Sequence, residues 1–390
     1  MNSFTFHIPT KVVFGKDSHL QVGELLNNYG ATKVLLHYGG NSAIKSGLLD
    51  QVKSCLNDYH IDFVELGGVV PNPRLSKVHE GIQLGRDEKI DFILAVGGGS
   101  VIDSSKAIAY GIPYQGEVWD FFTKKATPVS AIPVGTILTI AAAGSEMSNS
   151  TVITNEENWE KRGCNYEICR LRFAIENPEL TYSLPAYQTA SGCVDIMMHT
   201  MERYFTLADT MQLTDQFSEA LLRVVIHNAK ILLTNPSDYN ARAEVLWASS
   251  ISHNGLLACG GDIGDWASHR IEHELSGLFD VAHGAGLAVI WPSWANYVYK
   301  EKPERFAQYA KNVFDLHHED IIVLAQLGIQ ATTEFFKSLE MPTTIQELGI
   351  DITDEQIEEM AEKCAQANPS LGAFKKLDKK DIIAIYQNAK

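Results

Sequence analysis

The sequence predicts two domains, an α/β domain over residues 1–184 followed by an all-helical domain over residues 185–390. The chain has 390 residues, which is too long for one ordinary hydrophobic core. As far as about Leu184, short apolar runs alternate with helical patterns, whereas long helical patterns take over after Pro185. This order of patterns is typical of a parallel sheet covered by helices, joined to a separate helical body.

The first half contains four apolar runs of the β type. Runs that are apolar throughout, rather than alternating with polar residues, are expected for strands buried on both faces of a parallel sheet. The runs are KVLLHYGG from Lys33, DFVELGG from Asp62, DFILAVGGGS from Asp91 and VSAIPV from Val129.

The second half repeats apolar residues at helical spacing. The clearest examples are VDIMMHTMERYF, from Val194, and EALLRVVIHNAKILL, from Glu219. Few strand candidates occur between these segments and Lys390, so we expect this half to be helical throughout.

Composition and charge indicate a globular protein and exclude two kinds of partner. Hydrophobic residues make up 45% of the chain and charged residues 21%, with no long biased segment. The formal net charge of -16 would repel nucleic acids and anionic membranes. An anionic cofactor must then be bound by local devices, such as backbone N–H groups at a helix N-terminus.

The cysteines and the N-terminal segment favour a reducing, cytoplasmic location. Six cysteines are scattered without the regular spacing of a disulfide framework. Cys164 and Cys169 could form a metal or redox site, but their spacing matches no thiolate motif, and we interpret them as ordinary small residues. The segment MNSFTFHIPTK lacks the features of a signal peptide, and the most apolar stretch, 130–144, is too short to span a bilayer.

A glycine-rich turn follows the apolar run FILAV. Gly97, Gly98, Gly99 and Ser100 lie between this predicted strand and the predicted helix VIDSSKAIAY, an order that brings backbone N–H groups to a diphosphate. The turn is not the G-x-G-x-x-G fingerprint, which weakens a standard Rossmann interpretation. As an alternative, Ser100 and Asp103 have the spacing of a capping box, which would stabilise the helix start whatever is bound.

The turn HYGGNSAIKSG, after the first run, indicates the cofactor preference. An enzyme that prefers NAD would place an acidic residue here against the ribose 2′-hydroxyl, and none is present. Gly39, Gly40, Asn41 and Ser42 instead offer donors, with Lys45 nearby. We therefore expect NADP(H) to be preferred over NAD(H); the alternative is a plain turn selected for its backbone conformation.

Histidines and one aspartate form a candidate metal site. Asp195 and His199 are four residues apart on a predicted helix, so their side chains project from one face. His269 and His273 have the same spacing, and His283 follows in the turn VAHGAG, whose glycines allow close backbone approach. Nitrogen and oxygen ligands without thiolate suit Fe(II) or Zn(II). Spacing leaves open which of His269 and His273 is a ligand.

Motifs along nearly the whole chain resemble those of the iron-containing, group III alcohol dehydrogenases, and most closely the branch of butanol dehydrogenases and NADPH-dependent aldehyde reductases. The resemblance implies the fold of that family, which is shared with dehydroquinate synthase, and a catalytic Fe(II) or Zn(II) ion. The matching segments are FGKD (14–17), VVPNPR (69–74), VGGGSVIDSSKA (96–107), AAGSEMS (142–148), ENPELTYSLP (176–185), GCVDIMMHTMERYF (192–205), HRIEHELSG (269–277) and AHGAGLAVIWP (282–292).

The resemblance also implies roles for individual residues. Asp195, His199, His269 and His283 become the metal ligands, and His273 takes a catalytic, non-ligating place near the nicotinamide. The residues implied at the cofactor are Gly97, Gly98, Gly99, Ser100 and Asp103 on the diphosphate and nicotinamide side, Asn72, Thr139, Ser145, Tyr182 and Leu184 along the rest of its path, and Lys161 near the nicotinamide half.

We expect hydride transfer between NADP(H) and a small primary alcohol or aldehyde, with the metal acting as a Lewis acid. The alternatives are a glycerol dehydrogenase, a lyase such as dehydroquinate synthase, or a metal- and nucleotide-binding sensor without turnover. The resemblance also suggests a homodimer formed through residues 1–14. Trp266, Phe279, Trp291 and Trp294 flank the histidine motifs and would either wall a small apolar pocket or belong to the core.

Overall fold

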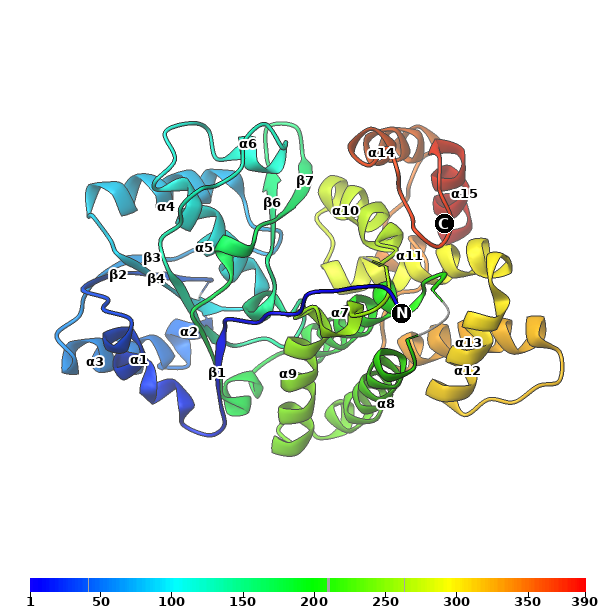
Figure 1. Ribbon diagram of the computed structural model, residues 1–390, viewed down its shortest axis with the longest axis horizontal. Helices are drawn as coiled ribbons and strands as arrows, with labels where there is room; N and C mark the ends of the chain where they lie inside the picture. Colours follow the sequence, from blue (N-terminus) through cyan, green and yellow to red (C-terminus); the bar gives the residue numbers. More distant parts are fainter. Residues whose placement is uncertain (41, 209–210, 263) are drawn as a thin grey trace. The chain divides into compact units, whose positions relative to one another are not determined.

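The computed structural model of the protein describes residues 1–40, 42–208, 211–262 and 264–390 (Figure 1). Its contacts group these residues into two compact units. The α/β unit comprises His7–Leu184, and the helical unit comprises Pro185–Lys390 together with Met1–Phe6. The first six residues were expected in the α/β domain. They fall in the helical unit instead, where the backbone N–H of Asn2 donates to the carbonyl of Gly260 at 2.8 Å.

The α/β unit is built on a sheet in the order β1-β8-β5-β4-β2-β3, in which every neighbouring pair of strands is parallel. Its register places Val34 opposite Phe92 and Ile93 opposite Val134. This sheet and the helical second unit confirm the predicted fold class. The strands are β1 (Lys11–Phe14), β2 (Lys33–Tyr38), β3 (Asp62–Leu66), β4 (Phe92–Gly97), β5 (Val134–Leu138) and β8 (Phe173–Glu176).

Strands β2, β3 and β4 lie where the apolar runs predicted them, whereas β5 lies later than predicted. The strand begins at Val134, which is the last residue of the segment VSAIPV, and it continues beyond the segment to Leu138. Pro133 has no N–H to donate to a neighbouring strand, and Val129 is 92% exposed. The edge strand β1, the strand β8 and an antiparallel hairpin were missed; the hairpin consists of β6 (Ser150–Asn155) and β7 (Glu160–Asn165).

Helices cover both faces of the sheet (Figure 1). On one face α1 (Val22–Asn28) and α3 (Leu48–Asp58) bury a cluster with alternate strand residues such as Val34 and Leu36. On the other face α5 (Gly99–Gly111) packs on β2, β4 and β5, and α4 (Leu75–Asp87) packs on α5. Two short helices, α2 (Ser42–Lys45) and α6 (Trp119–Phe122), complete the set.

The strand order reverses direction between β2 and β4. From β2 the chain runs outward to the edge strand β3, and it then returns to the other side of β2 to form β4, β5 and β8. In open parallel sheets, ligands bind beyond the carboxyl ends of the strands at such a reversal. Gly39–Gly40 follows β2, and Gly97–Ser100 starts at the last residue of β4; these are the two glycine-rich turns singled out from the sequence.

In the described part of the helical unit, every regular element is a helix. Helices α7 and α11 lie at its centre, because nearly all residues from 190 to 204 and from 284 to 295 are buried. The helices are α7 (Ala186–Tyr204), α8 (Gln212–Thr234), α9 (Tyr239–His253), α10 (Ala267–Phe279), α11 (His283–Val298), α12 (Pro303–Phe314), α13 (Ile321–Ser338), α14 (Asp354–Ala367) and α15 (Lys379–Ala389).

None of the helices in the described ranges combines the length and the apolar composition that crossing a membrane requires.

One buried histidine of the sheet makes the stability of the protein sensitive to pH. His37, on β2, is fully buried; its Nδ1–H donates to the carbonyl of Leu66 at 2.7 Å, and its Nε2 accepts from the Ser104 hydroxyl at 2.9 Å. Burial lowers the pKa of His37 from 6.5 to about 4, an effect that the Leu66 carbonyl partly opposes. The ring is therefore neutral in the folded protein at pH 7.

We predict that the free energy of unfolding falls as the pH drops from 6.5 toward 4, because in this range the unfolded chain binds a proton on His37 that the folded protein does not. The contribution of this residue between pH 7 and pH 5 is about 2 kcal/mol. Urea unfolding of the wild type and of His37→Gln at both pH values measures it. Equal losses of stability in the two proteins would contradict the prediction.

Candidate functional site

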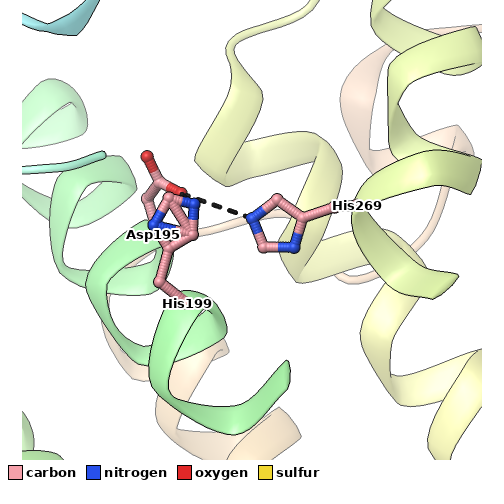
Figure 2. Close-up of side chains that lie close together, drawn as sticks. All are labelled: Asp195, His199 and His269. Atoms are coloured by element: carbon pink, nitrogen blue, oxygen red, sulfur yellow. Dashed lines mark ion pairs between the residues drawn. The ribbon is translucent and has the colours of Figure 1, made fainter. Parts of the chain in front are cut away.

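Helix α7 places Asp195 and His199 on one buried face (Figure 2). The residues are one turn apart, and both are less than 5% exposed. The Nε2 atom of His199 lies 3.7 Å from Oδ1 of Asp195. The i, i+4 spacing seen in the sequence therefore brings the two side chains together.

Two further histidines point at the same carboxylate oxygen. His269 lies in the first turn of α10, and His283 is the first residue of α11. Their Nε2 atoms lie 4.0 Å and 3.8 Å from Oδ1 of Asp195. Three imidazole nitrogens thus converge on one oxygen, and of the two candidates on α10 it is His269 that faces Asp195.

The two glycines beside His283 permit this convergence. A Cβ atom on Gly284 would lie 2.0 Å from the carbonyl oxygen of Ser191 on α7, and one on Gly286 would lie 2.8 Å from the Glu272 side chain. The start of α11 therefore approaches both α7 and α10 more closely than any other residue type allows.

The donor atoms fit a divalent metal ion. Ligands of a tetrahedral site with bonds of about 2.0 to 2.1 Å lie roughly 3.3 to 3.5 Å apart, and the nitrogens are only slightly farther than this from Oδ1. Within the described part of the chain, the buried Nε2 of His269 has no hydrogen-bond partner. Burial, followed by the nearby His253, lowers the pKa of His199 well below its usual value, so its ring offers a neutral nitrogen.

Two glutamates that sequence analysis missed contact the far side of these histidine rings. The Nδ1 of His269 lies 2.9 Å from Oε1 of Glu202, and the Nδ1 of His283 lies 2.5 Å from Oε2 of Glu272. Both glutamates are at most 3% exposed. The spacing contained a signal, because Glu202 follows Asp195 by seven residues and so lies on the same face of α7.

His273 lies beside His283 rather than against Asp195. Its ring centroid is 5.8 Å from that of His283, and it is 6% exposed. Glu272, His273 and His283 offer possible ligand atoms within 4.8 Å of one another. The structure therefore brings His273 next to the metal-ligand candidates, on the same helix as His269.

The aromatic residues near the histidine motifs divide into two groups. Trp266 contacts the rings of His199 and His269, at centroid distances of 6.0 and 5.3 Å. Trp291 and Trp294 are 1% exposed and pack against Phe205. These two tryptophans belong to the core of the helical unit, so the idea that they wall a substrate pocket is wrong.

In the α/β unit, helix α5 begins within the glycine-rich turn, at Gly99. Gly98 is the residue before the helix, and no side chain among the described residues caps it. The capping-box alternative for Ser100 and Asp103 is wrong, because the Asp103 carboxylate accepts from the Ser145 hydroxyl at 2.6 Å and from the Val152 N–H at 2.9 Å. No side chain among the described residues therefore competes with an anion for the backbone N–H groups at the start of α5, as an anion-binding site requires.

The other predicted cofactor residues lie in several loops of the α/β unit. Those that follow β2, β4 and β5 share one edge of the sheet, because the carboxyl ends of parallel strands lie together. Asn41 falls outside the described residues. Gly39 and Gly40 follow β2, Ser42 begins α2, and Asn72 precedes α4 with a left-handed φ of 53°. Thr139 follows β5, and Ser145 begins a short 3₁₀ turn (Ser145–Met147). Lys161 is 5% exposed on β7, and Tyr182 and Leu184 follow the turn Pro178–Thr181.

A buried lysine anchors the segment that carries Ser145. Lys106, on α5, is fully buried and donates to the carbonyls of Ser145, Ser148 and Ser150 at 2.8, 3.0 and 2.7 Å. Three charge-assisted hydrogen bonds fix this loop against α5. Lys106 was not predicted from the sequence, although it follows Asp103 by three residues on the same helix.

All six cysteines lie within the described ranges and are free thiols. Cys164 and Cys169 are buried, and the Sγ of Cys164 lies 3.4 Å from the Tyr110 hydroxyl. Burial raises the pKa of Cys164 to about 12, so it is protonated and unreactive at neutral pH.

Two family models match the chain. Residues 9–178 match iron-containing alcohol dehydrogenase, and residues 189–390 match the C-terminal part of the Fe-containing alcohol dehydrogenase family. The probable NADH-dependent butanol dehydrogenase 1 of Bacillus subtilis is 42% identical over 99% of each chain. The NADPH-dependent aldehyde reductase YqhD of Escherichia coli is 35% identical over 90% of each chain. The crystal structure of NADH-dependent butanol dehydrogenase A from Thermotoga maritima has a TM-score of 0.97 at 39% identity and covers 100% of this chain and 99% of its own.

These matches span both units and agree with the observed fold. The protein is an oxidoreductase of the alcohol dehydrogenase class. The chain belongs to the iron-containing alcohol dehydrogenase family, which confirms the resemblance seen in its motifs. Membership implies a divalent metal ion and a nicotinamide cofactor.

Proposed function

We propose that the protein transfers hydride between a nicotinamide cofactor and a small primary alcohol or aldehyde, at a divalent Fe(II) or Zn(II) ion held by Asp195, His199, His269 and His283. The observation that carries the proposal is the approach of three imidazole Nε2 atoms to 3.7–4.0 Å from one oxygen of Asp195. Relatives named as butanol dehydrogenases and an aldehyde reductase support this substrate class.

When bound, the metal ion polarises a substrate oxygen, and the nicotinamide supplies or accepts the hydride. The negative charge of the Asp195 carboxylate would partly neutralise the ion, and the three histidines would fix the position of the ion. We assign proton exchange to a ring nitrogen of His273, because this residue lies beside His283 on the helix that carries His269.

We predict that Asp195→Ala and His283→Ala each lose bound metal and turnover together, because each removes one of four ligands. Metal content by elemental analysis and butanal-dependent oxidation of NADPH measure the two losses. His317→Ala, which changes a side chain that is 67% exposed, is the control and should retain both. If either ligand variant turned over at the wild-type rate without metal, the ligand assignment would be wrong. If the wild type consumed no NADPH with any aldehyde of a series, a lyase or a sensor would replace the dehydrogenase.

We further propose that NADP(H) is preferred over NAD(H). The turn after β2 presents Gly39, Gly40 and Ser42, with Lys45 at the end of α2, and none of these residues is acidic. Such a turn accepts a 2′-phosphate better than a carboxylate would. Relatives are named for both cofactors, so the preference is argued from this turn.

A substitution at Gly40 tests the preference. A Cβ atom on Gly40 would meet no other heavy atom within 4 Å, so a side chain fits there. We predict that Gly40→Asp lowers kcat/KM for NADPH by about fivefold or more, since a like charge near the 2′-phosphate costs at least about 1 kcal/mol. The neutral Gly40→Asn is the matched control and should retain most of the activity with NADPH. A wild-type enzyme with a higher kcat/KM for NADH would overturn the preference itself.

We propose that two copies of the chain form a homodimer through residues 1–14. Phe4 and Phe6 are 54% and 45% exposed, and β1 is an edge strand whose outer side can pair with another strand. Light scattering should give twice the chain mass of 43.1 kDa, and the double substitution Phe4→Ser with Phe6→Ser should shift the protein toward the single-chain mass. A wild type with the single-chain mass at micromolar concentration would refute the dimer.

We also propose a reducing, cytoplasmic location, which fits the six free thiols. Recovery of the protein from a secreted or periplasmic fraction would refute it.

A further inference from the structure

Of the three histidines whose Nε2 atoms face Asp195, His269 and His283 each contact a buried glutamate through the other ring nitrogen, Nδ1. We propose that Glu202 and Glu272 are positioning residues that fix the tautomer and the direction of His269 and His283 and thereby set the affinity of the site for its metal ion. This inference rests on the proposed metal site. It concerns two residues that act through the ligand histidines.

Glu202 contacts His269 at two points and Trp266 at a third. Its Oε1 accepts from the backbone N–H of His269 at 3.0 Å and contacts the ring Nδ1 at 2.9 Å, while its Oε2 accepts from the backbone N–H of Trp266 at 2.6 Å. No residue of α10 itself caps this helix start among those described. One carboxylate from α7 therefore caps the first turn of α10 and orients the ring that this turn carries.

Glu272 fixes His283 from a fully buried position on α10. Its Oε2 lies 2.5 Å from the Nδ1 of His283. Gly286, one turn into α11, leaves the space for it, because a Cβ atom there would lie 2.8 Å from both Cγ and Oε1 of Glu272. The contact is thus built from three positions, the glutamate, the histidine and the glycine.

The carboxylates decide which ring nitrogen carries the proton. A carboxylate oxygen can only accept, so each Nδ1 carries the hydrogen and donates it, and each Nε2 keeps its lone pair. The Nε2 atoms are the ones that lie 4.0 Å and 3.8 Å from Asp195. A negative charge behind the ring also raises the basicity of the ligating nitrogen.

His199 is held differently and provides an internal contrast. Its Nδ1 has no hydrogen-bond partner within the described ranges, and its ring is packed between those of His253 and His269, at centroid distances of 4.0 and 4.6 Å. Carboxylate support is therefore specific to the two histidines at helix starts.

The test measures metal affinity, with Zn(II) and Co(II) as the probes in competition with a chromogenic chelator. We expect Glu202→Gln and Glu272→Gln to weaken the affinity by about 10- to 100-fold. The visible absorption bands of the Co(II)-loaded protein should change as well, because the ligand directions change. Gly286→Ala removes no carboxylate, but its added Cβ atom would lie 2.8 Å from the Glu272 side chain. We therefore expect it to weaken the metal affinity as well.

Glu219→Gln is the matched control. Glu219 lies on α8 of the same unit, is 4% exposed, and accepts from Tyr204, Gln308 and Asn312. The three residues that donate to it are not metal-ligand candidates, so its substitution should lower the melting temperature but leave the affinity and the Co(II) spectrum unchanged. A purely structural role for Glu202 and Glu272 would give the same result as this control.

The possible outcomes separate this inference from the proposed function. If Glu202→Gln, Glu272→Gln and Gly286→Ala all bound Zn(II) and Co(II) as the wild type does, while Asp195→Ala lost the metal, the positioning role would be overturned and the metal site retained. If Asp195→Ala itself bound the metal with wild-type affinity, the proposed site would fail. If a glutamate variant did not fold, Gly286→Ala would decide for the pair Glu272 and His283.

Discussion

The buried carboxylate of Asp195 is the constraint around which the helical unit is arranged. An ionised carboxylate taken out of water costs several kcal/mol unless positive charge or donors face it. Here three imidazole nitrogens face it, and in this family a divalent cation provides the opposing charge. Helices α7, α10 and α11 must approach closely for this to happen, and most residues of all three helices are accordingly buried. Gly284 permits the contact of α11 with α7.

In the α/β unit, too, glycine permits a close contact between elements, and a buried charged residue, a lysine, fixes a loop. Helix α5 starts so close to the end of β4 that a Cβ atom on Gly97 would lie 2.5 Å from the Val101 side chain. The same helix carries Asp103 and Lys106, both buried, which hold the segment 145–152 through hydrogen bonds to Ser145, Ser148, Ser150 and Val152. Buried charges thus fix the segment that follows β5, while no side chain among the described residues caps the first turn of α5.

Much of this arrangement could be read from the sequence, and the exceptions have physical causes. Apolar runs revealed β2, β3 and β4, because strands buried on both faces leave an unbroken apolar pattern. The edge strand β1, with only four residues, leaves no such pattern, and the prediction for β5 began too early because the run VSAIPV overlaps the strand only at Val134.

At the site, helical spacing paired Asp195 with His199 but could not choose between His269 and His273, since both share one face of α10. That choice depends on which ring turns toward α7, and Glu202 fixes the ring of His269 from that helix. Glu202 and Glu272 themselves were missed because a glutamate on a helix is usually a solvated residue. Only the packing of three helices shows that these two are buried.

The contact between Gly286 and Glu272 also has an evolutionary consequence. The two residues lie on different helices that are joined by a turn. The Glu272 side chain occupies the space that a side chain at residue 286 would need. A lineage that keeps the glutamate cannot accept a side chain at residue 286 without disturbing His283. A lineage that replaces the glutamate with a smaller residue is released from the glycine. The two positions are therefore expected to change together during descent, although neither belongs to the set of metal ligands.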